Sequence, residues 1–122
     1  MTGPARTYCV FCEIIAGREP AEIWYEDDTL IVFRNHLRWL PIQLLIVPKE
    51  HKTQEEFWRD DMERASALAV ELGKQHAPGG FRILSNFGED GMQSQPHGHL
   101  HLLGGRPLGM YVETVPRALF GR

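Results

Sequence analysis

Two stretches of the chain carry apolar residues at helical spacing. Between residues 9 and 16 apolar side chains recur every three to four positions and Gly17 follows, which predicts a short helix. A longer stripe predicts a helix over about residues 60–76, capped by Asp60 or Asp61 and ended by the turn at residues 77–80. The apolar positions of this stripe are Met62, Ala65, Leu68, Ala69 and Leu72.

Five short apolar runs, bounded by turn-forming residues, predict strands. They cover residues 22–25, 30–34, 43–47, 81–86 and 97–103. The Glu-Asp-Asp turn at residues 26–28 joins the first two, and Pro48 ends the third because proline cannot donate to a strand ladder. Most strands follow one another directly, so we predict a single α+β domain with a five-stranded antiparallel sheet, one long helix and one short helix.

Length and composition narrow the picture further. The chain has 122 residues, 43% hydrophobic and 24% charged, as expected of one globular domain. Thirteen basic and 16 acidic residues give a net charge of −3, which argues against a nucleic-acid polymer as partner. No run approaches the roughly 18 apolar residues of a membrane span, and residues 1–6 lack the apolar core of a secretory signal. We therefore expect a cytoplasmic protein without a membrane partner.

The most informative feature is a run of alternating histidines, His97, His99 and His101. On a strand, alternate side chains share one face, so three imidazoles would line one surface. Burying three titratable rings costs free energy unless each has a partner, which weakens a purely structural explanation. Nucleophilic or acid–base catalysis and metal binding both fit the run.

The residues before this run fit an anion pocket. Residues 93–96, Gln-Ser-Gln-Pro, supply amide and hydroxyl donors. Gly88 and Gly91 allow the backbone to approach a bound anion closely. Together with a neutral imidazole, these groups indicate a site for phosphate chemistry.

Residues 93–103, Gln-Ser-Gln-Pro-His-Gly-His-Leu-His-Leu-Leu, resemble the signature of the histidine triad (HIT) superfamily. The resemblance extends to the N-terminal Cys-x-x-Cys helix, the turn at residues 26–28, the Ile-Val-Pro-Lys-Glu-His stretch at 46–51 and Ser85-Asn86. It spans residues 9–105, which we take as the HIT domain, with a tail over residues 1–8 and a C-terminal extension over residues 106–122. In such proteins the extension packs at a homodimer interface, so the resemblance implies a homodimer.

The resemblance implies roles for the residues of the run. His99 is the nucleophile that attacks the α-phosphorus of a purine nucleotide and forms a nucleotidyl-histidine. His101 contacts the phosphate and Ser94 donates to the leaving group, while Gln93 and Asn86 bind phosphate or ribose oxygens. No metal takes part in this chemistry.

The resemblance also implies a nucleotide pocket. The base lies against apolar side chains, and ordinary core packing is the alternative for the same four positions. These are Val10, Phe11, Ile14 and Phe33. Asn35 stands where the family often has an aspartate on the ribose, and Gln43 stands where many nucleoside phosphoramidases of the family have a histidine.

Cys9 and Cys12 form a Cys-x-x-Cys pair, which needs two further ligands for a tetrahedral zinc site. By resemblance, His51 and His97 complete the site. Four protein ligands leave no position for water, so this Zn²⁺ is structural. A redox pair and two free thiols are the alternatives.

The sequence leaves more than one function open. The leading hypothesis is a nucleotide hydrolase or nucleotidyl transferase that acts on a phosphoramidate or a dinucleoside polyphosphate through His99. A zinc-stabilised module that binds a purine nucleotide with little turnover is the alternative. A zinc hydrolase that uses all three histidines of the run as ligands is a third possibility.

Overall fold

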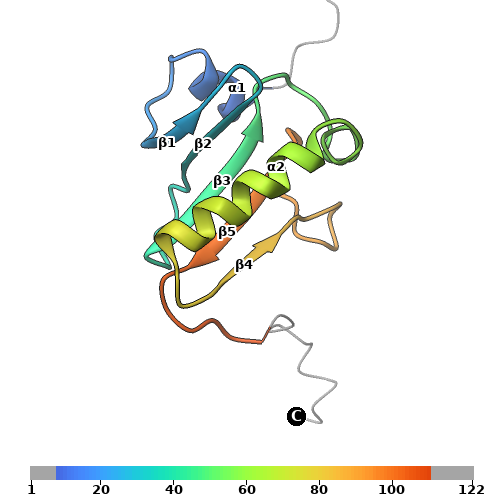
Figure 1. The fold of residues 1–122 in the computed structure, drawn as a ribbon. Helices are drawn as coiled ribbons and strands as arrows, with labels where there is room; N and C mark the ends of the chain where they lie inside the picture. Colours follow the sequence, from blue (N-terminus) through green and yellow to red (C-terminus); the bar gives the residue numbers. More distant parts are fainter. Residues whose placement is uncertain (1–7, 111–122) are drawn as a thin grey trace, which may run out of the picture.

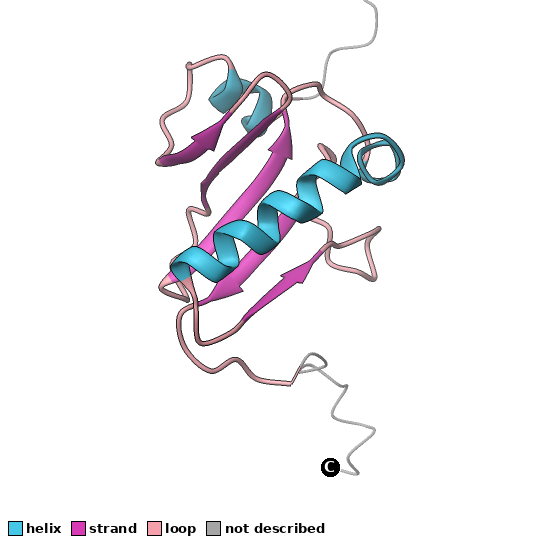
Figure 2. Ribbon diagram, viewed as in Figure 1, coloured by secondary structure: helices cyan, strands magenta, loops and turns pink. Residues whose placement is uncertain are grey.

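The computed structural model describes residues 8–110, which form one antiparallel sheet with two helices. The strands are β1 (Ile23–Glu26), β2 (Leu30–Arg34), β3 (Ile42–Pro48), β4 (Phe81–Leu84) and β5 (Leu100–Gly104). They pair in the order β1-β2-β3-β5-β4 (Figures 1 and 2). The helices are α1 (Val10–Ile15) and α2 (Gln54–His76). The predicted fold class is thereby confirmed, and most of the predicted C-terminal extension lies outside the described residues.

Helix α2 begins earlier than predicted. Its N-cap is Thr53, whose side chain accepts from the backbone N–H of Glu56, and the Glu56 carboxylate accepts in return from the Thr53 N–H. The prediction of a cap at Asp60 or Asp61 was wrong, because both residues lie within the helix. The first turns carry mostly polar residues, so the apolar stripe does not reveal them.

The last strand begins later than predicted. The ladder of β5 starts at Leu100, so His97 and His99 precede it. Their backbone is held instead by α2 and the segment before it: the Gly98 N–H donates to the Lys52 carbonyl at 2.8 Å, and the His99 N–H donates to the Gln54 side chain at 2.8 Å. These tertiary hydrogen bonds replace the ladder that alternation alone would predict.

The two faces of the sheet carry different layers. Helix α2 packs diagonally across one face (Figure 1), on a core built from alternate residues of β2, β3 and β5. Helix α1 covers the other face, where the remaining residues of β2 and β3 form a second core. His101 pairs with Leu45 in the sheet register, so its side chain lies on the α1 face. The sheet thus presents the side chain of His101 toward α1 and away from α2.

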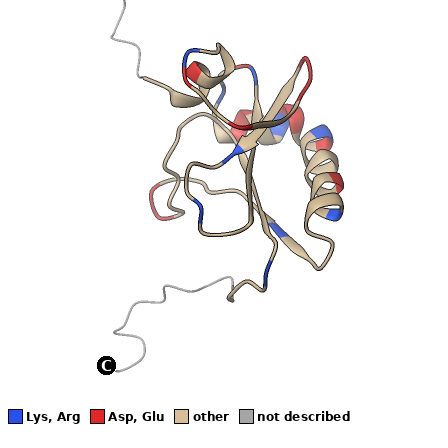
Figure 3. Cartoon of the chain, turned by 90° about the vertical axis from the view of Figure 1, so that its left-hand side faces the viewer, with Lys and Arg blue, Asp and Glu red and all other residues tan. Residues whose placement is uncertain are grey.

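Charged residues gather on α2 and on the turn between β1 and β2 (Figure 3). Asp27 in this turn accepts from the Tyr25 hydroxyl at 2.6 Å and from the Arg64 guanidinium of α2 at 2.8 Å. The Tyr25 hydroxyl, the Leu30 and Thr29 N–H groups and Arg64 lower the pKa of Asp27 to about 2. This network ties the hairpin to the long helix. Within residues 8–110 no helix has the length and apolar character needed to cross a membrane.

Candidate functional site

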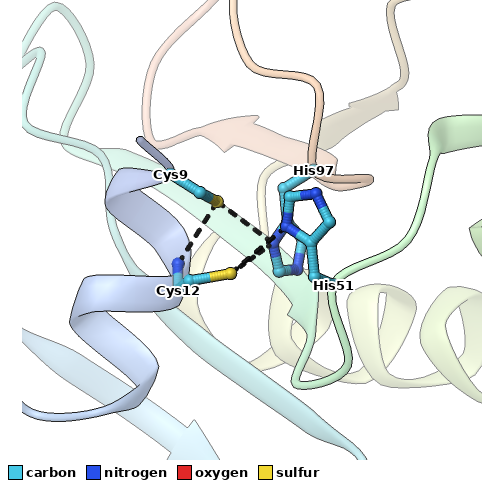
Figure 4. A group of neighbouring side chains, drawn as sticks. All are labelled: Cys9, Cys12, His51 and His97. Carbon is cyan, nitrogen blue, oxygen red and sulfur yellow. Dashed lines mark hydrogen bonds between the residues drawn. The ribbon is translucent and has the colours of Figure 1, made fainter. Parts of the chain in front are cut away.

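Two cysteines and two histidines from distant parts of the chain meet at the start of α1 (Figure 4). Their ligand atoms all lie within 4.8 Å of one another. The Cys9 sulfur is 3.4 Å from His97 Nδ1, and the Cys12 sulfur is 3.2 Å from His51 Nδ1. The structure therefore brings together all four residues expected as metal ligands.

The donor set of this cluster fits zinc. Two thiolate sulfurs and two imidazole nitrogens are the ligands of closed, tetrahedral zinc sites. His97 also has the orientation that a ligand needs: its Nε2 lies 2.8 Å from the Pro48 carbonyl oxygen, which leaves Nδ1 to face the cysteines. Among residues 8–110 this is the one such group of metal-binding side chains, and His97 is the only histidine of the run within it. A metal held by all three histidines therefore finds no support.

His99 is buried beside the metal cluster, with 2% of its surface exposed. Its Nδ1 lies 2.8 Å from the main-chain carbonyl of His97, an acceptor that fixes the proton on Nδ1 and leaves Nε2 with a lone pair. Burial lowers the pKa of His99 below its ordinary value, against a smaller opposing effect of this hydrogen bond. The ring is thus neutral near pH 7, with Nε2 unprotonated.

His101 lies next to His99, with ring centroids 5.0 Å apart. Burial, with a smaller contribution from His99, lowers the pKa of His101 to about 4. Its Nε2 is buried and has no hydrogen-bond partner among the described residues. A buried polar atom without a partner costs free energy, which a bound ligand could recover by supplying the partner.

A cavity of about 470 Å³ opens between α1 and the sheet. The expected base-pocket residues all line it: Val10, Phe11, Ile14 and Phe33, with Asn35 at the same cavity. Phe11 connects this cavity to the histidines, since its ring meets the His99 ring edge-on at 5.2 Å. Phe11 and Phe33 are also buried core residues, so core packing and cavity lining are not alternatives here. The side-chain oxygen of Asn35, Oδ1, accepts from the Leu37 N–H at 3.0 Å.

The loop from Asn86 to Pro96 carries the other expected site residues. Gln93 shapes this loop: its side-chain oxygen accepts from the Gly88 N–H at 2.9 Å, and its amide donates to the Gln95 carbonyl. Ser94 is exposed and lines a different cavity from the base-pocket residues. Among the described residues no hydrogen bond joins Ser94 to the histidines. The roles assigned to Gln93, Ser94 and Asn86 remain predictions.

Two residues next to His99 were not found by sequence reasoning. Gln54 accepts from the His99 N–H, and the Ser85 hydroxyl donates to the His99 carbonyl at 3.2 Å. Gln54 stands in a polar run of the sequence, and no local pattern indicates that its side chain is buried. Ser85 is part of the Ser-Asn pair in which the sequence resembles the family. That resemblance was the only indication in the sequence of a role for Ser85.

The fold and the site together define a class of protein: a five-stranded α+β domain with buried histidines beside a Cys₂His₂ cluster, and with a cavity whose wall is partly apolar. The HIT domain model matches residues 16–108, so the chain belongs to the HIT domain family, as the histidine run indicated.

Individual relatives agree with this assignment. The chain is 32% identical over 113 residues to the purine nucleoside phosphoramidase of Escherichia coli (strain K12), covering 82% of this chain and 89% of that protein. It is 35% identical over 106 residues to a 14 kDa zinc-binding protein of Brassica juncea, covering 81% and 94%. A histidine triad protein from Clostridium difficile has the same fold, with a TM-score of 0.78, 31% identity and coverage of 88% of this chain and 99% of that one.

Proposed function

We propose that this protein is a nucleotide hydrolase or nucleotidyl transferase that acts at the α-phosphorus of a purine nucleotide derivative through a covalent intermediate on His99. The observation that carries the proposal is the His99 ring: its Nδ1 is committed to the His97 carbonyl, and burial keeps the ring neutral. The free Nε2 then has the lone pair that attack on phosphorus requires.

The proposed reaction has two steps. The lone pair of His99 Nε2 forms a bond to phosphorus, and the bond from phosphorus to the leaving nitrogen or oxygen breaks with its electron pair. The Ser94 hydroxyl donates its proton to the leaving atom and takes a proton from solvent water in exchange. Water then attacks the same phosphorus and gives up a proton to the solvent. The bond from phosphorus to His99 Nε2 breaks with its electron pair, which releases the nucleoside monophosphate and restores the neutral ring.

The other groups bind and orient the substrate. The apolar cavity of Val10, Phe11, Ile14 and Phe33 takes the purine base, and Asn35 contacts the ribose. His101 binds a phosphate oxygen, and this contact gives its buried Nε2 a partner. Gln93 and Asn86 complete the contacts to phosphate or ribose.

The substrate class is the finer part of the proposal. A phosphoramidate or a dinucleoside polyphosphate presents the α-phosphorus that this chemistry needs, and the relative in Escherichia coli named as a purine nucleoside phosphoramidase favours the first. The apolar part of the cavity wall supports an aromatic base, without selecting among leaving groups.

We also propose that the Cys₂His₂ cluster binds Zn²⁺ and that this zinc is structural. Cys9, Cys12, His51 and His97 would hold it, and its four bonds would tie α1 to the segments that carry the two histidines. When bound, the metal supplies stability and no reacting group. The zinc-binding relative in Brassica juncea supports this assignment.

A homodimer and a cytoplasmic location complete the proposal. Strand β4 lies at the edge of the described sheet, and the apolar side chains of Trp58 and Phe87 are exposed nearby. An edge strand beside exposed apolar side chains supports pairing with a second copy. Sedimentation of the full chain at micromolar concentration tests it: a monodisperse monomer would contradict the homodimer.

The covalent intermediate is tested by intact-protein mass spectrometry. The protein is mixed with adenosine 5′-phosphoramidate and quenched with alkali within seconds, because a phosphohistidine bond does not survive acid. We expect an adenylyl adduct in the wild type and none in His99→Ala. Tight nucleotide binding with neither adduct nor AMP would instead identify a nucleotide-binding module, and AMP released without an adduct, only by metal-loaded protein, would indicate zinc chemistry.

A further inference from the structure

Gln54 is a buried glutamine at the first position of α2, with 3% of its surface exposed, and the proposed reaction does not use it. A buried amide must find hydrogen-bond partners or its burial costs free energy. Gln54 finds both of its partners on the main chain. Its carbonyl oxygen accepts from the His99 N–H at 2.8 Å, and its amide nitrogen donates to the Asn86 carbonyl at 2.9 Å.

These two partners belong to different parts of the proposed site. His99 carries the nucleophilic nitrogen, and Asn86 begins the loop that carries Gln93 and Ser94. The partners are 45 and 32 residues away from Gln54 along the chain. One side chain thus sets the position of the nucleophile relative to the loop that faces the phosphate and the leaving group.

The backbone of His99 depends on this hydrogen bond because it lies outside the strand ladder, which begins at Leu100. The main-chain carbonyl of His99 accepts a hydrogen bond from the Ser85 hydroxyl at 3.2 Å. The main-chain N–H of His99 donates to Gln54, its one hydrogen-bond partner among the described residues. The neighbouring Gly98 N–H bonds to Lys52, so the start of α2 and the segment before it hold two successive peptides.

We infer that Gln54 is a positioning residue for the nucleophile: its two hydrogen bonds hold the His99 peptide and the start of the loop at Asn86 in one fixed arrangement. This inference rests on the proposed function of His99. Both hydrogen bonds of Gln54 go to main-chain groups, so its effect on the reaction would pass through His99 and the loop. Displacement of a reacting group by about 1 Å costs on the order of a hundredfold in rate, which is why such a clamp affects catalysis.

The test compares Gln54→Met, which keeps the length of the side chain and removes both hydrogen bonds, with Tyr25→Phe as control. The Tyr25 hydroxyl donates to Asp27 and accepts from Arg64, so Tyr25→Phe weakens the contact between the β1–β2 hairpin and α2. Tyr25 lies on β1, away from the loop and from the His99 peptide. A general loss of stability therefore affects both variants, whereas loss of positioning affects one.

The readout is the rate of adenylyl adduct formation in a single turnover with adenosine 5′-phosphoramidate, together with the affinity for adenosine. We expect Gln54→Met to slow adduct formation about tenfold to a hundredfold, while adenosine affinity stays within about twofold because the base cavity lies on the α1 side. Tyr25→Phe should keep the wild-type rate. A wild-type rate in Gln54→Met, or an equal slowing in both variants, would overturn the inference.

Hydrogen exchange separates this inference from the proposed function. In the wild type the His99 amide should be protected, and Gln54→Met should lose that protection while Tyr25→Phe keeps it. Unchanged protection of the His99 amide in Gln54→Met would overturn the positioning role, whether or not the wild type forms an adduct. Absence of an adduct in the wild type would instead contradict the proposed function. If Gln54→Met does not fold, Gln54→Glu keeps an acceptor for the His99 N–H and loses the amide donor to Asn86. Slower adduct formation in Gln54→Glu supports the inference, and a wild-type rate overturns it.

Discussion

The main-chain carbonyl of His97 lies 2.8 Å from Nδ1 of His99. His97 therefore belongs to two sites at once: its ring faces the two cysteines, while its carbonyl sets the tautomer of the next histidine in the run. The Pro48 carbonyl holds the His97 ring from the other side. The orientation of His99 is thus built on a residue of the candidate metal cluster.

The lowered pKa of His99 predicts how activity depends on pH. The neutral ring is the reactive form, and burial moves its pKa below the ordinary histidine value of about 6.5. Above its lowered pKa the ring is neutral, so kcat/KM for adenosine 5′-phosphoramidate should stay level from pH 8 to below 6.5 and fall only at more acidic pH. An acid limb with its midpoint above pH 6.5 would show that the ring is not held neutral by burial.

The lowered pKa of His101 predicts a change of stability with pH. In the folded protein this pKa is about 4, against about 6.5 in an unfolded chain. Between these values the unfolded state binds more protons, so the free energy of unfolding rises with pH. The contribution of His101 to the free energy of unfolding is complete above pH 6.5 and is lost as the pH falls toward 4. Its full size is about 3 kcal/mol.

Urea denaturation from pH 4 to 8 measures this contribution. His101→Gln cannot titrate, so its stability should depend less steeply on pH between 4 and 6.5 than that of the wild type. His36→Gln is the control, because it removes a histidine at an exposed position outside the buried run. Equal slopes in the wild type and His101→Gln would contradict the prediction.

Metal loading should stabilise the fold whether or not the protein turns over substrate. A ligand that binds only the folded state at one hundred times its Kd adds about 2.7 kcal/mol to the free energy of unfolding. We expect added Zn²⁺ to raise the Tm of the metal-stripped wild type and not that of Cys12→Ser, measured by calorimetry. If Zn²⁺ shifts both equally, or neither, the cluster does not hold the metal.

Gly98 has no room for a side chain. A Cβ built there lies 2.7 Å from the Phe57 Cβ and 3.0 Å from the Thr53 carbonyl oxygen. Gly98→Ala should therefore cost about 1–3 kcal/mol of stability, because α2 and the histidine segment must move apart. In Gly79→Ala the new Cβ meets no atom within 4 Å, so this control should unfold at close to the wild-type urea concentration. Similar losses in both variants would show that close packing on α2 is not the cause.

Sequence reasoning predicted the helices and strands well where apolar periodicity was strong. The bounds of β2 were predicted to the residue. The start of α2 was missed because Phe57 is the one buried apolar side chain among its first polar residues. The start of β5 was predicted too early because the alternation of His97 and His99 is typical of a strand. In the structure the His99 N–H bonds to Gln54 and the Gly98 N–H bonds to the segment before α2, so this part of the chain lies outside the ladder.

The candidate site was predicted in part. The Cys-x-x-Cys spacing indicated the two cysteines of the candidate metal cluster, and the family resemblance supplied His51 and His97. The lining of the cavity followed from the family resemblance, and Phe11 shows why composition could not decide it: the same ring is core and cavity wall. Gln54 could not be predicted, since its burial depends on contacts between residues 32 and 45 positions apart.

Helix α1 belongs to both candidate sites. Its N-terminal end carries Cys9 and Cys12, and the same short helix supplies Val10, Phe11 and Ile14 to the cavity. If a metal ion raised the affinity for a base by ordering this helix, the base would raise the affinity for the ion by the same factor. A six-residue helix is thus the one element through which the two candidate sites would be coupled among the described residues.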